Sequence, residues 1–520
     1  MENKIRLQYS GFIIFAARML SVATGMIFVL LITRNTTKEQ YGIWSNIFDL
    51  MAYFMLLASV IPFWTTRFVA RGKDGAAKTG FIANLTIAII ATLIYIPLVP
   101  IITSVLGISG PYIVLYFIAS AYIIELYLVN VLEATLRAKK PEALGYGLLI
   151  EEACKITLAY VLISALQQRL VLQKGLLSLL AAMISLVTAI IIQITYYLKL
   201  VFADLKQKIR WDYAKEWIKG SAANIYNVMG NQLAAFIFIL LILYGGKAAR
   251  GEYQAAATIS NIITYSSFVA FALYPKLLAE KKLEDVTTSL RTVLMFAIPM
   301  VAGAIAMPDS FLTILNVTYG EPTPILILRL LACDAFIITI STFFTSVLFG
   351  FERLDEKAKI PFKQLVKSNI FKVFTLPYIH SAITLPTAFY VLTNFAYNPL
   401  QAALYVTIIN MSARFTMFLI LYIIVRKTVQ VIIPWRNILN YVFAAAVMGV
   451  ILYTIPHPTK ITPTIGAAIA GGLIYIILLM IIEKEARSLI RSIWSEVRAE
   501  IRNILPKSIN RKVENLWKNS

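Results

Sequence analysis

The sequence predicts an all-α polytopic membrane protein with about fourteen transmembrane helices. Three observations support this fold class. Hydrophobic residues make up 59% of the 520 residues and charged residues only 14%. Apolar stretches long enough to cross a bilayer recur along the whole chain. Lys and Arg are concentrated in the short segments between these stretches, as in other membrane proteins. Together these features exclude an ordinary soluble domain.

The predicted spans follow one another with short connections. Each is an apolar run bounded by charged residues, Gly or Pro, with boundaries uncertain by a few residues at each end. Their limits are Gly11–Thr33, Ile43–Thr66, Gly80–Ser104, Tyr112–Leu136, Leu144–Leu166, Gly175–Leu198, Gly220–Tyr244, Gln254–Leu278, Val286–Leu312, Ile325–Phe349, Phe362–Ala388, Pro399–Val425, Ile438–Ile455 and Ile461–Ile482.

The basic residues determine the predicted orientation. Most of them fall in alternate connections, beginning with Lys4 and Arg6 before the first span. The positive-inside rule then places both termini in the cytoplasm. We expect the protein in the plasma membrane. The net charge of +21 is accounted for by these connections. Because no continuous basic face is visible, we expect no nucleic-acid partner.

The chain also contains signs of an internal repeat. Aligning Tyr41 with Tyr253 also aligns Asp49 with Asn261 and Lys155 with Lys367. Six spans precede the basic, aromatic linker around Trp211–Trp217, so the second half enters the membrane in the same orientation as the first. The predicted domains are a six-helix lobe (1–202), a cytoplasmic linker (203–219), a second six-helix lobe (220–428), two appended helices (429–483) and a basic amphipathic tail (484–520) that we expect on the inner leaflet.

Ionisable and amide side chains deep in the spans are the candidate site residues. Charges in hydrocarbon are costly unless they pair or face water, so we expect several of them to line a hydrated cavity between the lobes. Lys155 has the alternative of pairing with Glu151 one turn away. An interhelical hydrogen-bond network is the alternative for the amides. The predicted cavity residues are Arg18, Glu125, Lys155, Asn224, Asn227, Asn231 and Arg414.

Three acidic residues are candidates for coupling to H⁺ or Na⁺, namely Asp49, Glu125 and Asp334. No nucleophile elbow, phosphate-binding loop or metal-ligand spacing is present. Both cysteines, Cys154 and Cys333, fall in predicted spans. We therefore expect no catalytic site, no metal and no cofactor, and a chain that functions as a monomer.

Fourteen spans arranged as 6+6+2, with a first span followed by the turn from Arg34 to Gly42, resemble the polysaccharide transporter family. This family includes flippases of lipid-linked oligosaccharides and lies in the multidrug/oligosaccharidyl-lipid/polysaccharide exporter superfamily. The resemblance implies alternating access, and a substrate that consists of an oligosaccharide on a polyprenyl or dolichyl (di)phosphate. It also implies that Arg18, Lys155 and Arg414 contact phosphate or acidic sugar. The stripe formed by Asn224, Asn227 and Asn231 would contact hydroxyls. The lipid tail would stay among the membrane lipids.

Two other functions remain open at this stage. Deep acids and deep cations are similar in number, which keeps an ion-coupled multidrug or metabolite antiporter of the same superfamily under consideration. A membrane glycosyltransferase or polymerase is the alternative from the enzyme class. The short loops predicted on the outer face leave little room to build such an active site.

Overall fold

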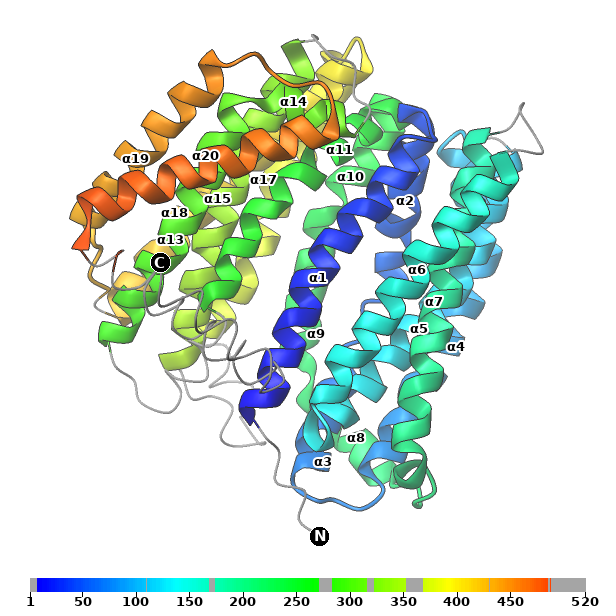
Figure 1. The fold of residues 1–520 in the computed structure, drawn as a ribbon. Coiled ribbons are helices and arrows are strands. Elements are labelled where there is room, and N and C mark those ends of the chain that lie inside the picture. The colour runs from blue at the N-terminus through cyan, green and yellow to red at the C-terminus, as the bar shows by residue number, and fades with distance from the viewer. Residues whose placement is uncertain are drawn as a thin grey trace, which may run out of the picture.

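The computed structural model contains helices and no strand in the residues that it describes, which are 7–108, 110–167, 174–270, 283–315, 322–351, 368–429, 431–484 and 487. Long helices run roughly side by side and form a bundle with two ends (Figure 1). The N-terminus lies at one end, and the opposite end holds the connection between α1 and α2. The predicted fold class, an all-α polytopic membrane protein, is confirmed.

The first half of the chain forms eight helices. They are α1 (Leu7–Thr33), α2 (Lys38–Phe54), α3 (Val60–Ala70), α4 (Ala76–Val105), α5 (Gly110–Lys139), α6 (Glu142–Gln167), α7 (Lys174–Leu205) and α8 (Trp211–Gly220). Within this half α6 packs on α1 and α7, and α5 packs on α3, α4 and α7. We call α1–α8 the first half below.

The second half continues without a strand in its described residues. Its elements are α9 (Ala222–Ala235), α10 (Ile237–Leu240), the π-helix η2 (Leu241–Gly245), α11 (Gly246–Thr264), the 3₁₀ helix η3 (Tyr265–Ala270), α13 (Leu283–Ala306), α14 (Pro308–Ile314), α15 (Pro322–Phe351), α17 (Asn369–Asn394) and α18 (Pro399–Thr428). Here α15 packs on α11 and α18, and α17 packs on α9 and α18.

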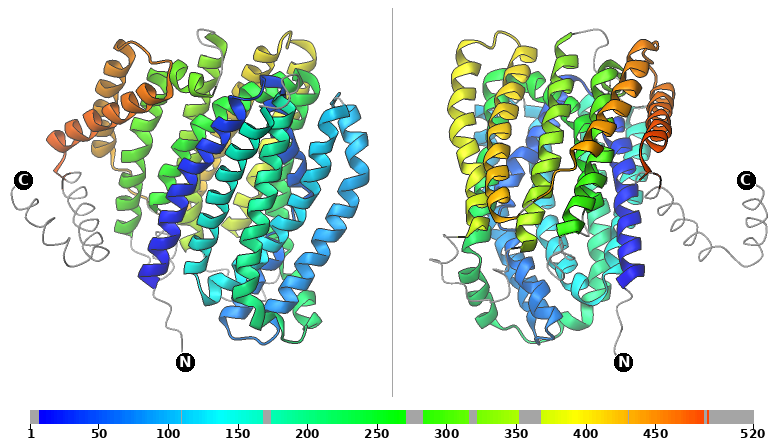
Figure 2. Two further views of the ribbon diagram at one scale, coloured as in Figure 1. Left: turned by 45° about the vertical axis from the view of Figure 1, so that its right-hand side comes forward. Right: turned by 90° about the vertical axis from the view of Figure 1, so that its left-hand side faces the viewer.

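Two more helices complete the described chain, α19 (Trp435–Thr454) and α20 (Ile461–Ile482). α19 packs on α13, and α20 packs on α19. Both lie on the side of the bundle away from α4–α7 (Figure 2). The predicted tail 484–520 falls almost entirely outside the described residues.

Each predicted span is helical over most of the residues that the structure describes. Nine stretches in the described residues are long and apolar enough to cross a membrane: α4, α5, α7, the run from Asn224 to Ser267, and most or all of α13, α15, α18, α19 and α20. The number of fourteen spans stays a prediction. Charged residues explain part of the difference, because α6 carries Glu151, Glu152 and Lys155 in its middle.

Three predicted spans are interrupted, and in the ninth of the fourteen Met307 separates α13 from α14. The second is broken by a turn between α2 and α3, around residues 55–59. The seventh changes to a π-helix, η2, before Gly246 adopts a φ of +87° and α11 begins without a loop. A positive φ is easily reached only by Gly, which explains how two helices can meet there directly.

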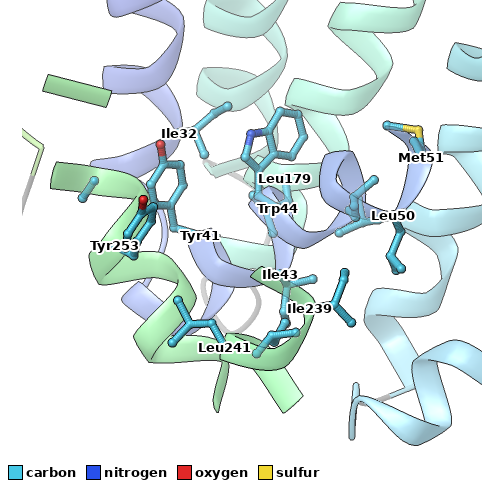
Figure 3. Packing of buried hydrophobic residues seen from close by; sticks show 14 of the residues in the cluster. Ile32, Tyr41, Ile43, Trp44, Leu50, Met51, Leu179, Ile239, Leu241 and Tyr253 are labelled. Carbon is cyan, nitrogen blue, oxygen red and sulfur yellow. The ribbon is translucent and has the colours of Figure 1, made fainter. Parts of the chain in front are cut away.

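The halves meet where α2 crosses α11, at the end of the bundle away from the N-terminus (Figure 1). Apolar side chains from both halves share one buried cluster there. Figure 3 shows Ile43 of α2 beside Ile239 and Leu241 of the second half, and Tyr41 near Tyr253. Because apolar helices in a membrane gain little from the hydrophobic effect when they associate, close packing of these side chains stabilises the crossing.

This crossing has a local twofold symmetry. A Cβ at Gly42 would collide with the backbone oxygen of Lys247, and a Cβ at Gly251 would collide with that of Lys38. Tyr41 bonds Thr258 through their hydroxyls at 3.3 Å. In the symmetry-related pair, Arg250 donates to Asp49 at 2.7 and 2.9 Å.

These reciprocal contacts change the alignment of the repeat. They match residue 41 with 250, 42 with 251 and 49 with 258, one helical turn away from the match of Tyr41 with Tyr253 that the sequence suggests. The shift arises because residues 34–37 separate α1 from α2, whereas η2 joins α11 directly. Residue identity between the two halves was therefore a misleading guide to the positions that are structurally equivalent.

The connection between the halves packs on the first half. Trp217 of α8 is fully buried and contacts Phe68 and Tyr213 through its ring. The ring nitrogen of Trp64 donates to Ser221 at 2.8 Å, directly before α9. The aromatic residues of the linker thus fasten α8 to α3 and α4, and the chain leaves the first half at Ser221.

Candidate functional site

A cavity of about 460 Å³ lies among α9, α15, α17 and α18. Its walls combine polar and apolar side chains, all from the second half. The polar ones are Asn227, Asn231, Ser341, Thr342, Thr345, Ser346, His380 and Arg414. The apolar ones are Ala234, Ile338, Phe349, Val373, Phe374, Leu376, Pro377, Met417, Phe418 and Leu421.

The cavity lies toward the end of the bundle that holds α8 and the N-terminus. Its lining residues belong to the C-terminal parts of α15 and α18 and the N-terminal part of α17, which all face this end. The crossing of α2 and α11 lies at the opposite end (Figure 1). With the predicted orientation, the cavity faces the cytoplasmic side and the crossing closes the outer side.

Arg414 is the charged residue of the cavity wall. Its guanidinium donates to the carboxylate of Asp334, which joins α18 to α15. The Arg414 side chain keeps 28% of its surface exposed, whereas that of Asp334 keeps 3% and does not line the cavity. The sequence offers no acidic partner for Arg414 along its own helix. The partner comes from another helix, 80 positions away in the chain.

The cavity therefore presents a cation whose counter-ion is hidden behind it. None of the described residues that line it is acidic. The ion pair with Asp334 uses only part of the guanidinium. The exposed face of Arg414 therefore retains the ability to bind a further anion or hydrogen-bond acceptor.

Two of the three predicted amides reach the cavity. Asn227 and Asn231 line it from α9, and the Asn231 amide donates to the Asn227 backbone oxygen at 2.9 Å. Asn224 lies one turn before Asn227 on the same helix and is half-buried outside the lining. The stripe thus contributes its later part to the wall.

The other predicted cations lie outside this cavity. Lys155 makes salt bridges of 2.9 Å to Glu151 and to Glu152 within α6. Thr24 of α1 donates to Glu152 at 2.7 Å, so this network holds α1 against α6. The structure therefore contains the pairing between Lys155 and Glu151 that was the alternative to a cavity role.

Arg18 and Glu125 are also separate from the cavity. The side chain of Arg18 is exposed on α1. Glu125 is buried in α5, and its Oε2 has no hydrogen-bond partner in the described part of the chain. The structure does not bring the predicted residues of the two halves together in one pocket.

Asp49 and Asp334, two of the candidates for ion coupling, are each bound by an arginine. Asp49 accepts from Arg250 across the crossing of the halves, and Arg250 is buried there over the ring of Phe238 at 4.8 Å. Asp334 accepts from Arg414. In the ranges that the structure describes, no three His, Cys, Asp or Glu side chains gather as metal ligands would.

Sequence reasoning missed several cavity residues. His380 of α17 is buried and lines the cavity beside Arg414. Asn410 is a polar neighbour of its ring, but neither ring nitrogen makes a hydrogen bond of normal geometry within the described residues. The hydroxyl residues of α15 were also missed. Ser and Thr are common in membrane helices, so their spacing alone carries little signal.

Comparison with known proteins supports a transporter fold. No protein-family model matches the sequence, and no match is found among curated proteins. A multidrug resistance transporter of the MATE family and MOP superfamily, in an inward-facing conformation, is 14% identical with a TM-score of 0.57; the match covers 78% of this chain and 95% of that one. An outward-facing structure with the same family description gives a TM-score of 0.52 at 14% identity, covering 81% and 95%.

The lipid II flippase MurJ in an inward closed conformation is 14% identical over 92% of this chain and 100% of its own, with a TM-score of 0.48. At these identities the two MATE-family structures establish the fold. The chain has the fold of these transporters of the MOP superfamily.

Proposed function

We propose that the protein is a flippase that moves a polyprenyl- or dolichyl-(di)phosphate-linked oligosaccharide from the inner to the outer leaflet by alternating access. The sugar head would travel through the cavity while the lipid tail stays among membrane lipids. Export of such glycolipids serves the assembly of cell-surface polysaccharide or glycoprotein.

The composition of the cavity wall is the observation that supports this function best. Arg414 offers a positive charge to a phosphate or an acidic sugar. Neutral hydroxyl and amide groups fill the rest of its polar surface, and they suit the hydroxyls of a glycan. Among the described residues that line the cavity, a lipophilic cation would find no carboxylate.

The proposal retains the predicted topology. Both termini would be cytoplasmic, with lobes at 1–202 and 220–428 that rock about the crossing of α2 and α11. A negative-inside potential would favour outward movement of an anionic head by roughly 2.3 kcal/mol per charge per 100 mV. Arg18, Lys155 and Asn224 would meet the head after the lobes rearrange, because they lie outside the cavity in this conformation.

Among the three candidates for ion coupling, we retain Glu125. Asp49 and Asp334 are bound by arginines, whereas one carboxyl oxygen of Glu125 is buried without a partner in the described residues. A buried carboxyl in such a place is most stable when protonated. Coupling to H⁺ would therefore act through Glu125.

An ion-coupled antiporter for drugs or metabolites is the second candidate. The two solved structures with TM-scores of 0.57 and 0.52 are multidrug transporters, which favours it at the level of fold. The described residues of the cavity wall include no carboxylate, which disfavours cationic drugs as cargo.

Reconstitution would distinguish these two functions. Proteoliposomes that contain the purified chain would be loaded with a fluorescent short-chain polyprenyl diphosphate that carries an oligosaccharide, or with the lipophilic cation tetraphenylphosphonium. We expect protein-dependent movement of the glycolipid between leaflets and none of the cation. Transport of the cation against a proton gradient, without glycolipid movement, would favour the antiporter and overturn the proposal.

A further inference from the structure

One face of α15 carries a group of hydroxyls to which the proposed function gives only a general role in contacting a glycan. Ser341, Thr342, Thr345 and Ser346 all line the cavity. Positions four residues apart are neighbours on the surface of an α-helix, so Ser341 lies one turn from Thr345 and Thr342 one turn from Ser346. The four side chains therefore form a continuous hydroxyl wall more than one helical turn long, which we call the α15 hydroxyl wall.

Three of these hydroxyls are available to a ligand. Ser and Thr in helices commonly donate to the backbone oxygen four residues earlier. Thr339 does so within α15 at 2.8 Å, and Ser346 does so at 3.0 Å. Ser341, Thr342 and Thr345 make no side-chain hydrogen bond in the described part of the chain. Their donors and acceptors are thus free to bind what enters the cavity.

The other walls complete a site of mixed character. α17 and α18 contribute the rings of Phe374 and Phe418 beside Pro377 and Leu421. A pyranose has the same two characters, because its C–H groups are apolar and its hydroxyls project around the ring. The cavity volume of about 460 Å³ lies near the lower end of the range for small-molecule sites. It suits a terminal part of an oligosaccharide better than a long chain.

We propose that Ser341, Thr342 and Thr345 form a saccharide subsite that reads the hydroxyl pattern of the glycan, separate from the anion-binding role of Arg414. This inference rests on the proposed function and names the part of the site that selects the sugar. A bare phosphate would engage Arg414 without needing the α15 hydroxyl wall. A lipophilic cation would leave these hydroxyls without partners.

The test compares binding of glycosylated and bare carrier to the full chain in nanodiscs. The probes are undecaprenyl diphosphate alone and undecaprenyl diphosphate that carries glucose, galactose or N-acetylglucosamine, with tetraphenylphosphonium as a third arm. The variants are Ser341→Ala, Thr342→Val and Thr345→Val, singly and combined. Thr339→Val is the matched control, since its hydroxyl is bonded within α15 and lies outside the cavity.

We expect the unaltered chain to bind at least one glycosylated carrier more tightly than the bare carrier. A lost neutral hydrogen bond corresponds to about three- to tenfold in Kd. Each single variant should therefore reduce the preference by about that factor, and the combined variant should abolish it without changing the Kd of the bare carrier. Thr339→Val should keep the full preference, and Ser346→Ala should reduce it least.

An unchanged preference in the combined variant would overturn the inference, and so would equal binding of all carriers by the unaltered chain. If the combined variant fails to fold, the three single variants decide the question in the same way. Failure of the proposed function looks different: tetraphenylphosphonium would bind and the bare carrier would not.

Discussion

The pair of Arg414 and Asp334 shows how one residue can serve both stability and function. Asp334 is buried, and its charge would be costly to bury without a partner. Arg414 keeps part of its surface toward the cavity. Removal of one member of such a pair leaves an uncompensated charge. The arginine is thus held in place by the fold at the same time as it is offered to a ligand.

This arrangement predicts a non-additive double-mutant cycle. Asp334→Ala should lower the free energy of unfolding by about 1–3 kcal/mol, because it leaves Arg414 without its counter-ion. The variant Asp334→Ala with Arg414→Ala should recover part of that loss, although it should not transport. Chemical denaturation of the purified protein in detergent measures the stability. Additive losses within about 0.5 kcal/mol would show that the two residues are not coupled.

At the scale of elements, the crossing of α2 and α11 depends on two glycines. Gly42 and Gly251 lie where each helix contacts the backbone of the other. Even a methyl group at Gly42 would collide with a backbone oxygen, and a backbone cannot move aside as a flexible side chain can. The contact is reciprocal, so the same argument applies to Gly251.

Gly42→Ala should therefore separate α2 from α11 and shift the protein away from the conformation with a closed crossing. Spin labels on the two helices, read by pulsed electron resonance, should report a longer distance or a second population. Gly303→Ala is the matched control, because a Cβ there meets nothing within 4 Å. An unchanged distance distribution in Gly42→Ala would show that this crossing tolerates a side chain.

A second prediction for this element concerns its ion pair. Arg250 is buried and donates to Asp49 from across the interface. Asp49→Ala leaves this guanidinium with Gln254 as a remaining acceptor. We expect a more open crossing and slower transport, whereas the double variant Asp49→Ala with Arg250→Met, which removes both charges, should close again. The same spin-label distance measures both outcomes; equal opening in the single and double variants would contradict a role for the charge.

At the scale of the whole molecule, much of the fold followed from sequence. Runs of apolar residues about as long as a bilayer is thick predicted helices that the structure contains, from α1 to α20. The basic, aromatic linker predicted a connection between the two halves, and α8 forms there. These features depend on local composition, which a sequence displays directly.

The arrangement of the site could not be predicted in the same way. The pair of Asp334 with Arg414 joins helices that are far apart in the chain, and only packing determines which charges meet. The cavity is lined by the second half alone, whereas the deep cations suggested residues from both halves. The three available hydroxyls of α15 differ from those of Thr339 and Ser346 in lacking a hydrogen bond to the backbone oxygen four residues earlier, and no sequence pattern reveals this difference.

The central claim concerns the direction in which a glycolipid moves, so it is tested best in cells. The gene would be removed from its host, and the lipid-linked oligosaccharide would be assigned to a leaflet with a membrane-impermeant oxidant or lectin. We predict accumulation on the cytoplasmic leaflet, relieved by the unaltered gene and not by one that encodes Arg414→Ala. Accumulation on the outer leaflet, or an unchanged distribution, would contradict the account.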